Sequence, residues 1–397
     1  MWANAQVPSR DDVDARGGAP WYLRLGAWIG IGTSPGALMA GAGMAAVGAP
    51  VATLVGVAAG VVLLTALAVA NGVRGQRLGA PTVELARRVF GPRAGPRVVA
   101  TLITMGVAGW SGVYFGVAGT ALATLLGVPV WLACLPVAAT VWLIYRGGFR
   151  RWNLLVGLTG VAAVAVAVLS YAAIRPGGGA PAVVAGDGVA QVGQALLIAG
   201  LVVSFAAVFA LRSPDFTWDA RHPRDVWRAG AVLALTLLVF LLLGVGIYRQ
   251  LGQWDLAQLV HRSTRPALGA LLLTLSVLAP VVSGLHSGAL GLARVAGWRA
   301  HAGAALVLVS ALTLGATGFH VRLLGFMAVI GAVLAPVMPV LLLAGARYRA
   351  RHGWAAWLAG SGTSLALVAL GVPVHVVVGI CVAAAGMVLA ARVDPAA

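Results

Sequence analysis

The chain has 397 residues, of which 60% are hydrophobic and only 9% are charged. Because a soluble domain carries roughly 25% charged residues, this composition excludes a water-soluble enzyme and indicates a protein that crosses a membrane many times. The net charge of +17 involves no lysine, and the arginines lie in short gaps between apolar runs instead of on one face among aromatic residues, which argues against a nucleic-acid-binding protein.

Apolar runs long enough to cross a membrane follow one another along almost the whole chain. A spanning helix needs about 20 such residues. The runs cover residues 24–47, 50–71, 98–127, 129–145, 153–174, 189–211, 229–248, 267–293, 301–318, 322–346, 354–371 and 373–391. We therefore predict an all-α, polytopic membrane protein of about twelve transmembrane helices. Short helices outside the spans are expected at residues 82–90 and within 249–266.

The positions of the arginines predict how these spans are oriented. If the N-terminus is cytoplasmic, the outer segments contain only five of the 27 arginines: Arg175, Arg249, Arg262, Arg265 and Arg322. Cytoplasmic segments of membrane proteins carry the excess of positive charge. The chain is rich in alanine and arginine, and we expect a multi-pass protein of the inner (cell) membrane of a bacterium. Both termini would be cytoplasmic, and residues 1–20 would form a disordered cytoplasmic tail.

The first span contains residues that favour a helix break. Between Gly30 and Gly36, Pro35 removes a backbone donor, and Thr33 and Ser34 supply hydroxyl groups. Transporters use discontinuous helices of this kind to expose backbone polar groups to a substrate at mid-membrane. The cluster therefore predicts a substrate-binding break. A proline kink that only packs against a neighbouring helix is the alternative.

The third span places an aromatic residue among small ones. Gly109 and Trp110 lie in the middle of the span, too deep for Trp110 to be an anchor at the membrane interface. A flat indole face at this depth either stacks on a planar ligand or packs within the helix bundle. Both interpretations are compatible with the sequence.

The sixth and eighth spans carry weaker signals. Ser204, Phe205 and Phe209 lie within span six without a neighbouring glycine or proline, so a break there is only weakly indicated. Span eight contains Ser283 and His286. A histidine at membrane depth is by default a functional candidate, and a neutral histidine bonded to a nearby carbonyl or hydroxyl group is the alternative.

Carboxylates are missing from the predicted spans, because all ten Asp and Glu residues fall in loops or tails. A proton relay built on buried carboxylates is therefore not expected, nor is a site for a cationic solute or a membrane hydrolase with paired acids. Cys134 and Cys381 lie in apolar runs and are expected to be small buried residues without a metal or a disulfide bond.

Three stretches resemble the nucleobase:cation symporter family of cytosine, purine and allantoin permeases. Residues 85–91, with the sequence Leu-Ala-Arg-Arg-Val-Phe-Gly, resemble the family's segment before the third span. The pair Gly109-Trp110 falls where the family has a Gly-Trp pair, and residues 213–217, Ser-Pro-Asp-Phe-Thr, resemble its Pro-Asp-Phe-Thr segment after span six. The glycine of the family's break in span six is absent from this chain.

The resemblance implies a LeuT-like transporter fold of two inverted five-helix repeats plus two extra helices. It places the first repeat at residues 21–174, the second at 189–346 and the two additional C-terminal helices at 354–391. It implies a substrate site between spans one, three, six and eight, where Trp110 stacks on the substrate. It also implies alternating access coupled to Na⁺ or H⁺, with a sodium site near Gly30, Ala279 and Ser283. No other cofactor is expected.

The leading prediction is a secondary active transporter for a neutral planar nitrogen heterocycle, such as cytosine, another nucleobase, allantoin, another hydantoin or hydroxymethylpyrimidine. Its partners would be this small molecule and the lipid bilayer. The candidate substrate-binding residues are Trp110, Gly109, Thr33, Ser34, Ser204, Phe205, Phe209, Ser283 and His286. A LeuT-fold transporter of amino acids or another small solute is an alternative. A non-transporting membrane protein or a membrane-embedded enzyme is the alternative from another class.

Overall fold

A computed structural model describes residues 21–147, 152–172, 187–344 and 349–393. The tail predicted for residues 1–20 and the outer arginine Arg175 lie outside the described residues. In the part of the chain that the structure describes, every regular element is a helix. The fold is therefore the predicted all-α membrane bundle.

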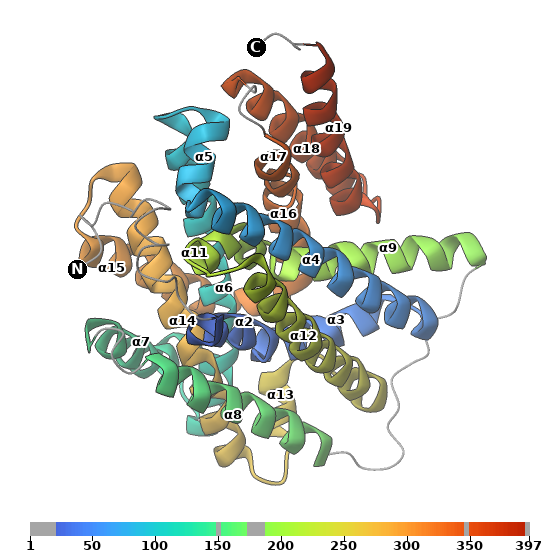
Figure 1. The fold of residues 1–397 in the computed structure, drawn as a ribbon. Coiled ribbons are helices and arrows are strands. Elements are labelled where there is room, and N and C mark those ends of the chain that lie inside the picture. Colours follow the sequence, from blue (N-terminus) through green and yellow to red (C-terminus); the bar gives the residue numbers. More distant parts are fainter. Residues whose placement is uncertain (1–20, 148–151, 173–186, 345–348, 394–397) are drawn as a thin grey trace.

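The described part of the first half of the chain begins with a short 3₁₀ helix and continues in seven α-helices of 8 to 33 residues (Figure 1). Its elements are η1 (Trp21–Arg24), α2 (Leu25–Gly32), α3 (Pro35–Val47), α4 (Pro50–Leu78), α5 (Thr82–Phe90), α6 (Ala94–Leu126), α7 (Val130–Gly147) and α8 (Trp152–Ala172).

The second half contains the remaining helices. Its elements are α9 (Gly188–Phe205), α10 (Ala207–Leu211), α11 (Ser213–Thr217), α12 (Pro223–Leu251), α13 (Leu256–His261), α14 (Pro266–Ala296), α15 (Ala300–Ala316), η3 (Phe319–Arg322), α16 (Leu323–Leu334), α17 (Val337–Leu343), α18 (Ala350–Ala369) and α19 (His375–Val393).

The helices agree closely with the predicted spans. Among the described residues, nine helices are long and apolar enough to cross a membrane. The other three predicted spans are the first, which is split into α2 and α3, the ninth, which is the 17-residue α15, and the eleventh, which is α18. The short helices expected outside the spans are α5 and α13. One expectation was wrong: Cys134 is buried, but Cys381 is exposed on α19.

Helices from the two halves pack against each other in a reciprocal pattern. The long helix α4 packs against α9, while its counterpart α12 packs against α3, and the central helices α6 and α14 pack along each other. The pair α18 and α19 stands together at the edge of the bundle (Figure 1). A reciprocal arrangement of this kind is what an inverted repeat produces.

Glycines allow α3 and α12 to approach until their backbones touch. A Cβ atom added to Gly41 would lie 2.1 Å from the carbonyl oxygen of Leu241, and one added to Gly244 would lie 2.0 Å from that of Leu38. Small residues at helix contacts are typical of membrane bundles, where close backbone packing replaces the hydrophobic driving force. This contact fixes α3 in the centre of the protein, and all residues from Pro35 to Ala45 are buried.

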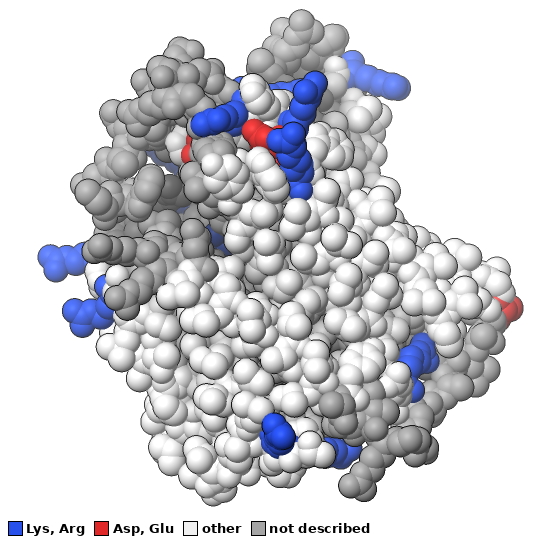
Figure 2. Space-filling model, turned by 60° about the horizontal axis from the view of Figure 1, so that its bottom comes forward, with Lys and Arg blue, Asp and Glu red and all other residues white. Residues whose placement is uncertain are grey.

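Charged side chains are separated from a broad uncharged surface. Figure 2 shows most of the blue and red atoms near one end of the molecule and a few arginines near the other, with white side chains between them. Many of the exposed residues on the helices are Leu and Val, such as Val62, Leu143 and Val161. An apolar band of this kind fits a protein surrounded by lipid.

Candidate functional site

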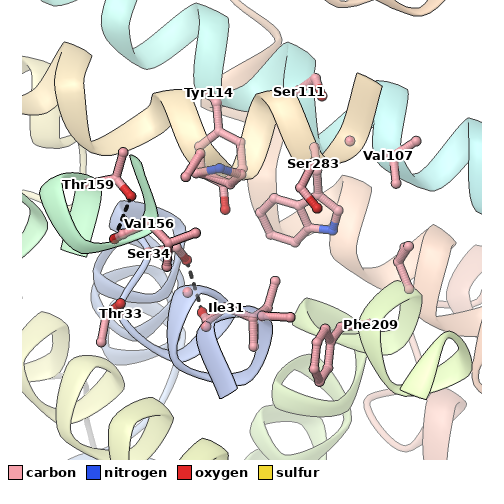
Figure 3. Close-up of a pocket in the computed structure, with 18 of the residues that line it drawn as sticks. Ile31, Thr33, Ser34, Val107, Ser111, Tyr114, Val156, Thr159, Phe209 and Ser283 are labelled. Atoms are coloured by element: carbon pink, nitrogen blue, oxygen red, sulfur yellow. Dashed lines mark hydrogen bonds between the residues drawn. The ribbon is translucent and has the colours of Figure 1, made fainter. Parts of the chain in front are cut away.

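A cavity of about 100 Å³ lies in the interior, where five spans meet. Its walls come from α2 and the break after it, the middle of α6, the first part of α8, the α9–α11 segment and the middle of α14. Apolar side chains form most of the lining. Figure 3 shows Ser34, Tyr114 and Ser283 turned toward this space, with Phe209 across from them.

The first wall is the predicted break in span one. Helix α2 ends at Gly32 and α3 begins at Pro35, so Thr33 and Ser34 form the connection. The Ser34 hydroxyl accepts a hydrogen bond from the backbone N–H of Ala37 at 3.3 Å and donates one to the carbonyl oxygen of Ile31 at 3.1 Å. A serine at this position caps the new helix and satisfies one of its free donors. Thr33 and Ser34 both line the cavity.

Trp110 forms the second wall. Its ring contacts Phe205 at a centroid distance of 5.0 Å and Phe326 at 5.5 Å, both edge to face. Trp110 therefore packs within an aromatic cluster and also lines the cavity, and its stacking on a ligand stays a prediction. Gly109 does not line the cavity: a Cβ atom there would lie 2.4 Å from the Phe326 ring, so this glycine makes room for Phe326.

The third wall is a break in span six. Helix α9 ends at Phe205, and Ala206 leaves the helical conformation with φ −110° and ψ 20° before α10 begins. Phe205 and Phe209 line the cavity on either side of the break. Ser204 does not: it donates to the carbonyl oxygen of Gly200 and packs against Gly331 of α16.

The fourth wall comes from α14. Ala279 and Ser283 line the cavity together with Gly30 of α2, so the three residues expected near a sodium ion surround the same space. Pro280 lies inside the helix and has no N–H to donate to the Ser276 carbonyl group one turn earlier. The hydroxyl groups of Ser276 and Ser283 and the Ser276 carbonyl group are oxygen donors of the type that hard cations prefer. His286, by contrast, is not part of the cavity lining.

Several cavity residues were not selected from the sequence. These are Ser111, Tyr114, Thr159, Ser276, Arg212 and Phe216. Tyr114 belonged to the small-residue stretch around Trp110, and its hydroxyl group fits against Gly36, where a Cβ atom would lie 2.8 Å away. Arg212 directly follows the sixth predicted span, and the structure places it in the cavity wall.

Comparisons with known proteins were made by sequence and by structure. No protein-family model and no curated protein sequence matches this chain. Solved structures do match. Mhp1, a nucleobase-cation-symport-1 family transporter in a closed conformation with bromovinylhydantoin bound, superposes with a TM-score of 0.72 at 15% identity, covering 99% of this chain and 96% of that one.

Two further structures have the same architecture. An inward-facing conformation of Mhp1 gives a TM-score of 0.74 at 14% identity, covering 95% of this chain and 93% of Mhp1. A Na⁺-coupled sialic acid symporter in a substrate-bound outward-open state gives a TM-score of 0.65 at 12% identity. The match covers 98% of this chain and 93% of the symporter. The chain has the LeuT fold.

The LeuT fold explains why the two broken helices meet at the cavity. The breaks after α2 and after α9 lie in the first helix of each half, and the reciprocal packing brings both to the centre of the bundle. Discontinuous helices at matching positions of two inverted repeats mark the binding site in transporters of this architecture. The cavity is therefore the candidate substrate site.

Proposed function

We propose that this protein is a secondary active transporter for a small planar nitrogen heterocycle. The observation that carries the proposal is the position of Trp110, which lines the cavity beside two helix breaks. An indole ring offers a flat apolar surface to an aromatic ligand. Thr33, Ser34 and Ser283 border the same space. The Thr33 and Ser34 hydroxyl groups donate to backbone carbonyl oxygens, so they would accept hydrogen bonds from N–H groups at the edge of a ring.

The proposed substrates are nucleobases, hydantoins such as allantoin, and hydroxymethylpyrimidine. Support comes from the fold of Mhp1, whose structure contains a hydantoin, and from the size of the cavity. A dry cavity of about 150 Å³ holds one benzene ring, and the cavity here measures about 100 Å³. A single-ring compound therefore suits the site better than a nucleoside.

The coupling ion forms the second part of the proposal. Na⁺ would bind among Gly30, Ala279 and Ser283, where the Ser276 carbonyl group also lacks a helical partner. H⁺ is the other candidate. We also propose the repeat boundaries 21–174 and 189–346, the additional helices 354–391, and the location in a bacterial inner membrane with both termini in the cytoplasm.

Reconstituted proteoliposomes test this function. Uptake of radiolabelled cytosine, uracil, hypoxanthine, allantoin and hydroxymethylpyrimidine would be measured under a Na⁺ gradient, a proton gradient and no gradient. We expect saturable uptake of at least one ring compound that one gradient stimulates. Saturable uptake of leucine or glycine alone would instead assign an amino acid transporter. No uptake of any solute under any gradient would favour a non-transporting protein.

A further inference from the structure

Arg212 is a charged residue in an otherwise uncharged cavity. Of the described residues that line the space, it alone carries a charge at neutral pH. Its side chain is only 13% exposed, whereas the arginines that belong to the charged surface on the same side are open, with 54% for Arg87 and 60% for Arg228. Arg212 is therefore not a surface charge that merely orients the protein in the membrane.

Arg212 connects α10 to α11 in the segment that lines the cavity. Phe205, Phe209 and Arg212 are spaced by four and three residues, and all three line the cavity. The break at Ala206 separates Phe205 from the other two, and Arg212 directly follows α10. Phe216, one turn further, stacks on Phe209 at a centroid distance of 5.4 Å and lies 5.2 Å from the Arg212 guanidinium group. This stacking supports the guanidinium plane beside the aromatic lining.

Two other partly buried arginines, Arg74 and Arg249, donate hydrogen bonds from their terminal amino groups to backbone carbonyl oxygens. Both amino groups of Arg74 donate to backbone carbonyl oxygens, those of Leu342 and Ala344. Arg249 donates to the carbonyl oxygen of Gly48 at 2.6 Å. These arginines close helix ends, where the last carbonyl groups have no helical partner.

The ion pair of Arg212 involves only one nitrogen of its guanidinium group. Its ion pair with Asp215 is formed through Nε and is long, at 3.8 Å. Asp215 also accepts a hydrogen bond at 2.8 Å from the backbone N–H of Thr82. Among the described residues, the contacts of Arg212 are this ion pair and the Phe216 ring, and neither uses a terminal amino group as a hydrogen-bond donor. A planar fork of N–H donors at the end of an aromatic cavity matches a carboxylate group.

Building on the proposed transport function, we propose that the preferred substrate is a single-ring heteroaromatic carboxylate, whose ring lies against Trp110 and whose carboxylate binds the terminal amino groups of Arg212. The carboxylate points toward the arginine-rich end of the bundle. A neutral ring fits the aromatic part of the site but leaves the guanidinium donors without a partner. The site therefore prefers the acid over an uncharged compound of the same shape.

Matched ligand pairs test this preference on the full-length protein in detergent. Pyridine-3-carboxylate is compared with pyridine-3-carboxamide, and uracil-6-carboxylate with uracil, by isothermal titration calorimetry. Because a hydrogen-bonded charge pair contributes about 1.5–3 kcal/mol, the wild-type protein should bind the acid of at least one pair about tenfold to a hundredfold more tightly. A wild-type protein that binds acid and neutral partner equally well overturns the proposal, whatever any variant does.

Two substitutions show whether Arg212 causes the preference. Arg212→Gln should bind the acid and its neutral partner with equal affinity. Arg212→Lys should keep part of the preference for the acid, because lysine retains the charge but not the planar fork. The exposed Arg228→Gln is the control and should leave the ratio unchanged. If Arg212→Gln weakens both ligands by the same factor, the residue has only a structural role and the proposal is wrong.

The outcomes also separate this inference from the function on which it rests. Transport of neutral rings without any preference for acids would leave the proposed function standing and overturn the role of Arg212. Binding of neither the acids nor the neutral rings would overturn both. Tighter binding of an aliphatic amino acid than of any ring would show that Arg212 binds a carboxylate of another class of solute, and would contradict the proposal.

Discussion

Nε2 of His320 lies 3.7 Å from Oδ2 of Asp255, and both side chains are almost completely buried, with exposures of 3% and 4%. His320 belongs to η3 and Asp255 precedes α13, so the pair joins two connections between spans. It lies beyond the end of α12, whereas Arg212 lies before the start of that 29-residue helix. The pair therefore links two connecting segments at the end of the bundle remote from Arg212. His320 also packs on Gly116 of α6.

Removing the charge from Asp255 should destabilise this end of the protein. Asp255→Asn can still cap α13, where Oδ1 now accepts a hydrogen bond from Ala257 at 2.9 Å, but it loses the carboxylate. We expect a loss below about 1 kcal/mol, because the 3.7 Å between Nε2 and Oδ2 is longer than a hydrogen bond. Thermal unfolding in detergent measures this effect, and Asp255→Ala should be worse because it also removes the cap. Strictly additive effects of Asp255→Asn and His320→Gln would show that the two side chains do not interact.

Replacing Trp110 should weaken substrate binding more than it weakens the fold. Loss of one aromatic platform costs about 1–3 kcal/mol for stacked bases, so Trp110→Ala should raise the dissociation constant of the transported ring compound. Trp354→Ala is the matched control, because Trp354 packs on Phe90 in the peripheral part of the bundle. It should lower the unfolding temperature and leave affinity intact. Equal affinities of wild type and Trp110→Ala would disprove the site assignment.

The cap at the first helix break can be tested without a ligand. Ser34→Ala removes the acceptor for the Ala37 N–H and should cost about 1 kcal/mol, as for other helix caps. Ser34→Thr retains a hydroxyl group and should cost less. Thermal unfolding of the ligand-free protein distinguishes the two. If both variants unfold at the wild-type temperature, the Ser34 hydroxyl does not stabilise the start of α3.

The backbone contact between α3 and α12 predicts opposite effects for similar substitutions. Gly41→Ala and Gly244→Ala place a methyl group against a backbone carbonyl, and overpacking of this kind costs about 1–3 kcal/mol. Gly362 of α18 has no atom within 4 Å of the added methyl group. Gly362→Ala should therefore stabilise its helix by about 0.5–1 kcal/mol. Unfolding temperatures that rise for all three variants would contradict the close helix contact.

The sequence was sufficient to predict the spans and the first break. Apolar runs and short polar gaps define most of the helices, and Pro35 with its neighbouring hydroxyl residues marks the end of α2. The side of each helix that faces the cavity was harder to predict, because these helices are apolar on nearly every face. Adjacent residues point about 100° apart, so Trp110 lines the cavity while Gly109 faces Phe326, and Phe205 lines it while Ser204 faces α16.

Charged residues in loops were the second difficulty. A count of arginines and carboxylates treats every loop residue as exposed to water. Arg212 and Asp255 lie in segments between apolar runs, as predicted, yet their side chains are only 13% and 4% exposed, because the connecting segments fold back against the bundle. The sequence contains no local signal for this folding, since burial of these residues depends on helices distant in the chain.

The two helix breaks differ in their physical cause. The first break follows from residues at the break itself, because Ser34 caps α3 and Pro35 is its first residue. The second occurs at Ala206, in a conformation that an alanine adopts without a glycine or proline nearby. Its bend is therefore imposed by surrounding helices. Motifs that require glycine at this point will overlook such chains, so the LeuT fold extends to sequences that glycine signatures do not detect.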